Sequence, residues 1–260
     1  MPDNARAASG KELRFSAGGA FVNSLAHRDR RSEVMDQPGL DERLHHQALE
    51  GLRRGNVVSN TSRVLWRGLE AAGVLTPSTG SQPVRVLDLA CGGGDVVLGL
   101  AQLARRRNVP FAAHGCDLNS LAVSHAQAAA ERAGITSANF FQLNALEDPL
   151  PTDYDAIYCT LFLHHLAESD GIRLLQRMAA VARRAVLVDD LVRSRLGFAL
   201  VWAGCYLLTR SPVVHTDGPL SVRAALSLDE ARELAERAGL RGATIRRHWP
   251  ERFLLTWRKP

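Results

Sequence analysis

The sequence has almost no lysine, since all but two of its 32 Lys and Arg residues are arginine and the exceptions are Lys11 and Lys259. A formal net charge of +5 by itself points toward nucleic acid. The arginines, however, alternate with acidic residues along predicted helices and form no basic block, a pattern typical of solvated helix faces. We therefore expect no nucleic-acid partner.

Closely spaced cysteines are also missing. No Cys-x-x-Cys pair occurs, and the four cysteines lie far apart at Cys91, Cys116, Cys159 and Cys205. Buried, reduced thiols in a cytoplasmic protein are a better interpretation than a disulfide framework. No His/Cys/Asp cluster has metal-ligand spacing, so we expect metal-independent chemistry. The N-terminus shows no charged segment followed by an apolar one, so export is not indicated.

The most apolar stretch, residues 196–209 (LGFALVWAGCYLLT), is too short for a membrane span, which requires roughly 20 residues. A helix that is apolar on every face is buried, covers an apolar pocket or touches a membrane surface. Burial is the simplest interpretation. The position after the fifth predicted strand favours a lid over an apolar substrate, and contact with a membrane surface stays open.

An alternation of short apolar strands with helices predicts the fold. We expect residues 1–30 to form a flexible arm and residues 31–80, which contain two amphipathic helices, to form a helical cap. Residues 81–260 form the main domain, with a lid insertion near 191–226. Its strands are predicted at 84–90, 111–117, 139–145, 154–163 and 184–190, with helices between most of them. This pattern predicts an α/β fold with a parallel sheet covered on both faces.

The last residues depart from this alternation. Ser227 and Glu230 are spaced as a capping box at the start of a predicted helix over 229–239. Two strand-like pieces then flank Trp249-Pro250-Glu251, which predicts a hairpin in place of another crossover helix.

The glycine-rich segment Val86-Leu-Asp-Leu-Ala-Cys-Gly-Gly-Gly-Asp95 is the sharpest signal in the sequence. It joins a strand to a helix, the position at which open α/β sheets bind ligands. A dinucleotide fingerprint requires a third glycine where this chain has Val97, and no Gly-Lys-Ser/Thr follows as in a P-loop. Asp88 suits a ligand that carries an ammonium group, such as S-adenosylmethionine (SAM). Asp117, at the end of the second strand, suits ribose hydroxyls.

Three segments resemble the class I SAM-dependent methyltransferases. VLDLACGGGD is similar to their first motif and GCDLNSLAVSHA to their acidic second motif. YDAIYCTLFLHHL resembles the strand-four motif of the small-molecule branch, which includes ubiquinone/menaquinone-biosynthesis methyltransferases. The resemblance covers roughly residues 80–190 and, through the final helix and hairpin, extends to 260. It implies a Rossmann-like, seven-stranded, mostly parallel sheet with an antiparallel last strand, and SAM as the cofactor.

The resemblance also implies which residues bind SAM. The methionine end of SAM would contact Asp88, Ala90, Cys91, Gly92 and Gly94. The ribose and adenine would contact Asp117 and Leu118, and the edge of the adenine would contact Asn144 and Ala145. Thr160, at the end of strand four, would complete the site. Asn144 departs from the family pattern, in which Asp is common, but its amide oxygen can still accept a hydrogen bond from the adenine amino group.

Two histidine pairs are candidates for proton transfer. His164 and His165 follow strand four, and a neutral imidazole is a suitable base; a packing or capping role is equally compatible with the sequence. His215 and Asp217 form the second candidate pair, for which an ordered turn on Asp217-Gly-Pro is slightly favoured. Asp189 and Asp190, at the end of strand five, are expected to orient groups in the pocket. For substrate binding we expect Arg54, Asn56, Trp202 and Arg223.

These features predict methyl transfer to a small, apolar or aromatic acceptor of phenolic, polyketide-like or lipid-like character. Oxygen is favoured over carbon as the acceptor atom. The alternatives are a SAM-binding protein without turnover, an RNA or protein methyltransferase, and an NAD-dependent oxidoreductase, which Val97 disfavours.

Overall fold

A computed structural model of the protein describes residues 25–35, 37, 39–76 and 82–260. Most of the predicted N-terminal arm therefore lies outside the described residues.

One seven-stranded sheet forms the centre of the molecule, with the order β3-β2-β1-β4-β5-β7-β6. Five strands are parallel, and β7 is antiparallel to both β5 and β6. The strands are β1 Val84–Leu89, β2 Phe111–Asp117, β3 Ala138–Gln142, β4 Ala156–Thr160, β5 Ala185–Leu191, β6 Thr244–His248 and β7 Arg252–Arg258. The predicted mostly parallel sheet and the C-terminal hairpin are thus confirmed.

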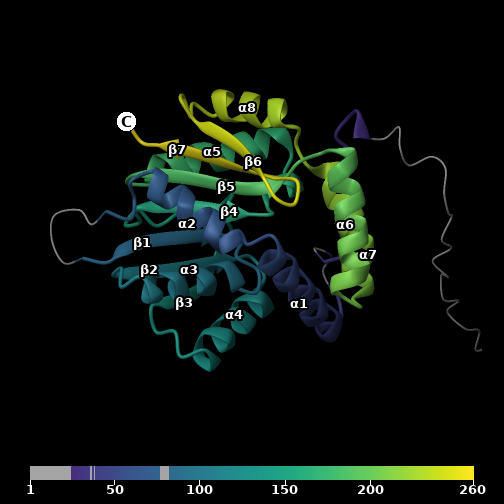
Figure 1. Ribbon diagram of the computed structural model, residues 1–260, viewed down its shortest axis with the longest axis horizontal. Helices are drawn as coiled ribbons and strands as arrows, with labels where there is room; N and C mark the ends of the chain where they lie inside the picture. Colours follow the sequence, from purple (N-terminus) through teal and green to yellow (C-terminus); the bar gives the residue numbers. More distant parts are fainter. Residues whose placement is uncertain (1–24, 36, 38, 77–81) are drawn as a thin grey trace, which may run out of the picture.

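Helices cover both faces of this sheet (Figure 1). They are α1 Glu42–Val58, α2 Thr61–Ala71, α3 Asp95–Arg106, α4 Ser120–Arg132, α5 Glu168–Val181, α6 Arg195–Leu208, α7 Pro212–Ala224 and α8 Leu228–Arg237, with a short 3-10 turn, η2, at Leu163–His165. One apolar core lies between the sheet and α5 and α8, and a second between the sheet and α2, α3 and α4.

The two N-terminal helices have different positions. Helix α2 packs directly on the sheet, because Gly68 has no side chain to separate it from Leu187 of β5 and Leu254 of β7. A Cβ at Gly68 would lie 2.7 Å from the Leu187 side chain. Helix α1 instead lies with α6 and α7 beyond the carboxyl ends of the parallel strands (Figure 1). This group of helices stands over the edge where ligands bind in such sheets.

Segment 211–225 is a helix, so the turn expected on Asp217-Gly-Pro is wrong. Ser211 caps α7 by accepting a hydrogen bond from the Val214 N–H. Pro219 lies inside the helix, where it removes a single N–H donor. Gly218 allows α7 to approach α6 closely, since a Cβ there would lie 2.4 Å from Cys205 Sγ. Tight packing of the helix pair therefore outweighs the local turn preference of Gly-Pro.

Strands three and four end earlier than the sequence predicts. The apolar residues continue past Gln142 and Thr160, but the chain leaves the sheet there. Leu161 adopts a left-handed backbone with φ of 52°. The residues that follow each strand turn toward the helices beyond the sheet edge and form part of a cavity.

Candidate active site

A cavity of about 1140 Å³ lies between the carboxyl ends of the strands and helices α1, α6 and α7. The glycine loop after β1 and the residues after β2, β3 and β4 form one side of it. Apolar side chains of α6 and α7 form the opposite side. Ligand cavities usually hold about 300–1,000 Å³, so this volume accommodates a cofactor and a second small molecule together.

The glycine loop presents its backbone to this cavity. Ala90 and Gly92 have positive φ values of 58° and 51°, and both line the cavity with Cys91 and Gly93. A left-handed alanine is strained, which is common where a loop is shaped for a ligand. A Cβ at Gly92 would meet only Leu49 Cδ2, at 3.7 Å. Gly92 therefore keeps space open toward the cavity and toward α1.

Gly94 has a different role from the one predicted. It does not line the cavity. A Cβ at Gly94 would lie 2.6 Å from Phe140 Cε1 and 2.8 Å from Ala126 Cβ. Close packing of α3 on β3 and α4, together with a φ of 75°, therefore requires this glycine. Packing thus accounts for the glycine without a contact between Gly94 and the cofactor.

Asp88 does not line the cavity, so its predicted contact with the methionine end stays a prediction. It is fully buried inside β1, between Gly115 and Tyr158 of the neighbouring strands. Burial raises the pKa of Asp88 well above its ordinary value, and the charges of Asp95 and Asp117 add to this shift.

The carboxylate that does reach the cavity from the end of this motif is Asp95, at the start of α3. Burial raises the pKa of Asp95, and the Asn56 side chain, which donates to Asp95 Oδ2 at 3.0 Å, opposes this shift. Sequence reasoning did not single out Asp95, although it closes the motif VLDLACGGGD.

Asp117 fixes the loop at the end of β2. Its Oδ2 accepts a hydrogen bond from the Gly92 N–H at 2.9 Å, and its Oδ1 accepts one from the Asn119 N–H at 2.9 Å. Asp117 and Leu118 line the cavity. The position after β2 is the one from which an acid reaches the ribose of an adenosine, and the contact of Asp117 with a ribose stays a prediction.

Asn144 and Ala145 line the same end of the cavity. The Asn144 side-chain oxygen accepts a hydrogen bond from the Leu146 N–H at 3.0 Å, and an amide oxygen has a second lone pair for an adenine amino group. The structure thus brings all predicted cofactor residues except Asp88 and Gly94 to one cavity, namely Ala90, Cys91, Gly92, Asp117, Leu118, Asn144, Ala145 and Thr160.

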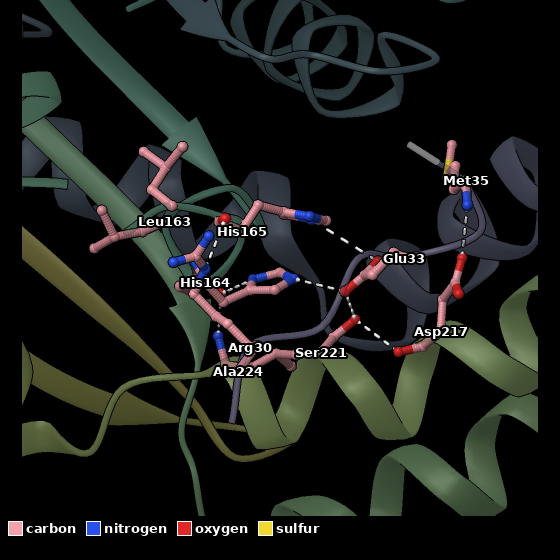
Figure 2. A network of polar contacts seen from close by, with 12 residues as sticks. Arg30, Glu33, Met35, Leu163, His164, His165, Asp217, Ser221 and Ala224 are labelled. Atoms are coloured by element: carbon pink, nitrogen blue, oxygen red, sulfur yellow. Dashed lines mark hydrogen bonds and ion pairs between the residues drawn. The ribbon is translucent and has the colours of Figure 1, made fainter. Parts of the chain in front are cut away.

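His164 and His165 lie at the other end of the cavity, in η2 (Figure 2). His164 is buried; its Nδ1 lies 2.7 Å from Asp190 Oδ1, and its N–H donates to Asp190 Oδ2. Burial raises the pKa of Asp190, but His164, together with the Leu191 N–H and the charge of Arg252, outweighs this effect and the pKa is lowered. Asp190 therefore fixes the orientation of the His164 ring, as the position after strand five suggested.

Glu33 completes this end of the cavity, and no sequence signal indicated it. Its carboxylate oxygens lie 3.7 Å from His164 Nε2 and 3.9 Å from His165 Nε2. Ser221 of α7 donates a hydrogen bond to Glu33 Oε1 at 2.7 Å. Figure 2 shows the carboxylate between the imidazoles and α7. Only tertiary structure brings these parts of the chain together.

The segment that carries Glu33, residues 25–35, crosses η2 and α7. Arg28 donates hydrogen bonds to the carbonyl oxygens of His164, Leu166 and Ala224. Arg30 donates to the His165 carbonyl oxygen at 3.1 Å. These backbone contacts hold the segment over the acceptor end of the cavity.

The predicted pairing of His215 with Asp217 is wrong. The two residues are two positions apart on α7 and face different directions. His215 Nε2 lies 2.9 Å from the Thr209 carbonyl oxygen, and its ring stacks on Tyr206; His215 does not line the cavity. Asp217 does line the cavity, but its carboxylate accepts hydrogen bonds from the backbone N–H groups of Val34 and Met35.

Three of the predicted substrate residues do not line the cavity in this structure. Arg54 donates to the Leu208 carbonyl oxygen at 2.9 Å and so joins α1 to α6. Trp202 is 53% exposed on the outer side of α6. Arg223 is buried, with its guanidinium over the Phe198 ring. The way in which α1, α6 and α7 pack on one another sets these directions.

Asn56, the fourth predicted substrate residue, does line the cavity. Its side chain donates to Asp95 and accepts from Arg252 Nη1 at 3.0 Å. Arg252 in turn donates to Asp189 Oδ1 at 2.6 Å. Asn56 therefore belongs to a buried polar network that connects α1, α3 and the end of β5.

Helix α6 is apolar on both sides. Its inner side, including Val201, Gly204 and Cys205, lines the cavity, whereas its outer side exposes Trp202 and Tyr206. In the described part of the chain, no helix has the length and apolar character required to cross a membrane. Helix α6 lies over the cavity, and its role as a lid stays a prediction.

Comparison with known proteins identifies the central part of this fold. Residues 86–185 match a family model described as a methyltransferase domain. This range contains the glycine loop, Asp117 and both histidines of η2. A search of curated proteins found no match.

Solved structures of methyltransferases share the fold at low sequence identity. Magnesium protoporphyrin IX methyltransferase from Synechocystis PCC 6803, with bound S-adenosylhomocysteine (SAH), is 17% identical, with a TM-score of 0.55 over 87% of this chain and 91% of that one. A putative O-methyltransferase from Nostoc punctiforme is 16% identical, with a TM-score of 0.60 over 92% of this chain and 67% of that one. An O-methyltransferase family 2 protein from Planctomyces limnophilus, in complex with apigenin, is 18% identical, with a TM-score of 0.52 over 78% and 62%.

These likenesses establish the Rossmann-like methyltransferase fold. The first neighbour has also been solved with SAM, the cofactor that the resemblance of the sequence motifs implies. The family match and the neighbours support SAM as the cofactor of this domain. They do not single out the ubiquinone-type branch.

Proposed function

We propose that this protein transfers a methyl group from SAM to an oxygen atom of a small apolar or aromatic acceptor. The observation that carries this proposal is one continuous cavity of about 1140 Å³. At one end it contains the glycine loop and Asp117, and at the other end Glu33 and the two histidines. An apolar wall from α6 and α7 connects the two ends.

The cofactor end fits SAM better than a dinucleotide. The exposed backbone of Ala90 to Gly93 and the carboxylate of Asp117 form a site for a nucleoside with a short charged tail. Methyl transfer is an in-line displacement at the sulfonium, so a second molecule held close to the methyl group accounts for much of the rate acceleration. The single cavity provides that arrangement.

The acceptor end favours oxygen over carbon. Glu33, His164 and His165 are polar groups in a cavity whose other walls are largely apolar, and they are suited to bind a hydroxyl group and remove its proton. The apolar side chains of α6 exclude water and suit a phenolic, polyketide-like or lipid-like body. Neighbours solved with apigenin or acting on magnesium protoporphyrin IX support a ring-containing acceptor.

The first experiment is calorimetric titration of the purified protein with SAM, SAH and NAD. Binding of SAM and SAH without NAD is expected, and binding of NAD alone would contradict the proposal. A screen of phenolic and lipid-like acceptors with methyl-labelled SAM then tests turnover. SAH binding without product from any acceptor class favours a SAM-binding protein that does not catalyse transfer. Labelling of RNA or protein alone favours the macromolecular alternative.

A further inference from the structure

Three potential metal ligands converge at the acceptor end of the cavity (Figure 2). They are Glu33 of the N-terminal segment and His164 and His165 of η2, and their donor atoms all lie within 4.8 Å of one another. We propose that they bind one divalent transition-metal ion, zinc first of all, whose open coordination position faces the cavity. The metal site itself is independent of the proposed function. Only the binding of the acceptor oxygen at the open coordination position rests on that function.

The distances are close to those of a coordinated site. Glu33 oxygens lie 3.7 Å from His164 Nε2 and 3.9 Å from His165 Nε2. Two donors bound at about 2.1 Å to a tetrahedral ion lie about 3.4 Å apart. To reach that spacing, the Glu33 oxygens have to approach each imidazole nitrogen by about half an ångström or less. The third pair of donors, the two imidazole nitrogens, lies within 4.8 Å and has to close by up to about 1.4 Å.

The type of donor selects the class of ion. Two imidazoles and one carboxylate with an open position are typical of catalytic zinc and of some iron(II) sites. Mg²⁺ and Ca²⁺ prefer oxygen ligands throughout, so the two histidines argue against them. The expectation of metal-independent chemistry considered only spacing along the sequence, and Glu33 is far from the histidines in sequence.

Neighbouring groups orient two of the ligands. Asp190 holds His164 Nδ1 at 2.7 Å, which leaves Nε2 directed toward Glu33. A carboxylate behind a ligating histidine fixes its ring and increases its basicity toward the metal. Ser221 donates to Glu33 Oε1 at 2.7 Å, which fixes one carboxylate oxygen and leaves Oε2 on the side of His165.

The charge at this site also favours a cation. Glu33 is 7% exposed. Within the part of the chain that the structure describes, its ion-pair partners are the two imidazoles and no Arg or Lys side chain. Asp190, by contrast, already pairs with His164 at 2.7 Å. Buried carboxylates are costly unless a positive charge compensates them, and a divalent ion between Glu33 and the imidazoles would provide that charge.

An ion at this position would assist the proposed transfer. A hydroxyl group of the acceptor bound to the ion would have a lowered pKa and would lose its proton to bulk water. With the ion bound, the three ligand residues would therefore not serve as the base themselves. The oxygen then forms a bond to the methyl carbon as the carbon–sulfur bond breaks, and the electron pair stays on sulfur to give SAH. Glu33, His164 and His165 hold the ion throughout.

The test uses metal-free full-length protein titrated with zinc chloride, and with cobalt chloride followed by its visible absorption. One zinc per chain and the d–d bands of a coordinated cobalt are expected. Loss of an outer partner of a metal ligand usually lowers metal affinity about 10–100-fold, so His165→Ala and Glu33→Gln should each lower zinc affinity by at least that factor. Melting temperature and SAH binding verify that the variants fold.

The matched control is His125→Ala, which removes one imidazole of the separate His46–His125 contact at 2.9 Å. It should bind zinc as the unmodified protein does. Absence of saturable zinc binding, unchanged affinity in both ligand variants, or loss of binding in the control would each overturn the proposal. If SAH binds and zinc does not, the metal site alone is wrong; if zinc binds and SAH does not, the proposed function alone is wrong.

Discussion

Replacement of Gly94 by alanine separates two roles that glycines have in a ligand-binding loop. The left-handed backbone at Gly94, with φ of 75°, costs an alanine about 1 kcal/mol. The new Cβ would also lie 2.6 Å from Phe140 and 2.8 Å from Ala126, and overpacking of this kind costs about 1–3 kcal/mol. Together the free energy of unfolding should fall by about 3 kcal/mol.

Thermal unfolding measures this loss against a matched control. Gly134 has φ of 61° and no atom within 4 Å of the position that a Cβ would occupy, so Gly134→Ala has only the backbone cost of about 1 kcal/mol. At about 2–4 °C per kcal/mol for a chain of this size, Gly94→Ala should lower the melting temperature by about 6–12 °C and Gly134→Ala by about 2–4 °C.

Two further measurements complete this test. Phe140→Leu shortens the side chain that the new Cβ meets, so Gly94→Ala should cost less in that background. Since Gly94 does not line the cavity, the folded variant should retain SAH affinity, whereas Gly92→Ala, which adds a methyl group at the cavity, should lose it. Equal melting losses for Gly94→Ala and Gly134→Ala would refute the packing argument.

Three other predictions address the loop, the thiols and an ion pair. Asp117→Asn should weaken SAH binding by about 10–150-fold, because a charge-assisted hydrogen bond to the loop contributes about 1.5–3 kcal/mol. Asp88→Asn should change SAH binding little, because Asp88 does not line the cavity, and calorimetry giving the reverse order would contradict this. Burial raises the pKa of Cys116 to about 12 and that of Cys205 to about 11. Because the thiolate is the reactive form, a thiol reagent at about pH 8 should react only slowly with the native protein. After denaturation the same reagent should modify all four thiols. Hydrogen bonding to Arg193 lowers the pKa of Glu230, so its stabilising contribution is present above the unfolded value of about 4.3 and lost as pH falls through the folded pKa. Glu230→Gln should therefore lower the free energy of unfolding by about 1 kcal/mol at about pH 7 and leave it unchanged in strong acid. Denaturant titrations measure this, and a loss of unfolding free energy that does not depend on pH would exclude the ion pair as its cause.

Local sequence patterns predicted most of the fold. Short apolar strands, helical periodicity and the capping box at Ser227 are properties of neighbouring residues, and the structure has the sheet, the helices and the C-terminal hairpin that they indicate. The glycine loop and Asp117 could likewise be placed at one end of a cavity, because the carboxyl ends of parallel strands always meet at the same edge of the sheet.

Directions of side chains inside these elements could not be predicted in the same way. Asp88 and Gly94 belong to the most recognisable motif, yet the strand buries Asp88 and the helix turns Gly94 toward Phe140. Segment 211–225 has turn-forming residues but becomes helical because it packs on α6. Burial against distant residues decided each of these cases, and local preference did not.

Contacts between distant parts of the chain were decided by tertiary structure alone. Nothing around Glu33 indicates that it will contact His164 and His165, because the contact depends on the path of residues 25–35 across η2 and α7. The sequence by itself thus determined the cofactor end of the cavity, where the relevant residues follow strands in a fixed order. Folding of the N-terminal segment onto the domain determined the acceptor end, since hydrogen bonds and burial between remote residues leave no periodic pattern along the chain.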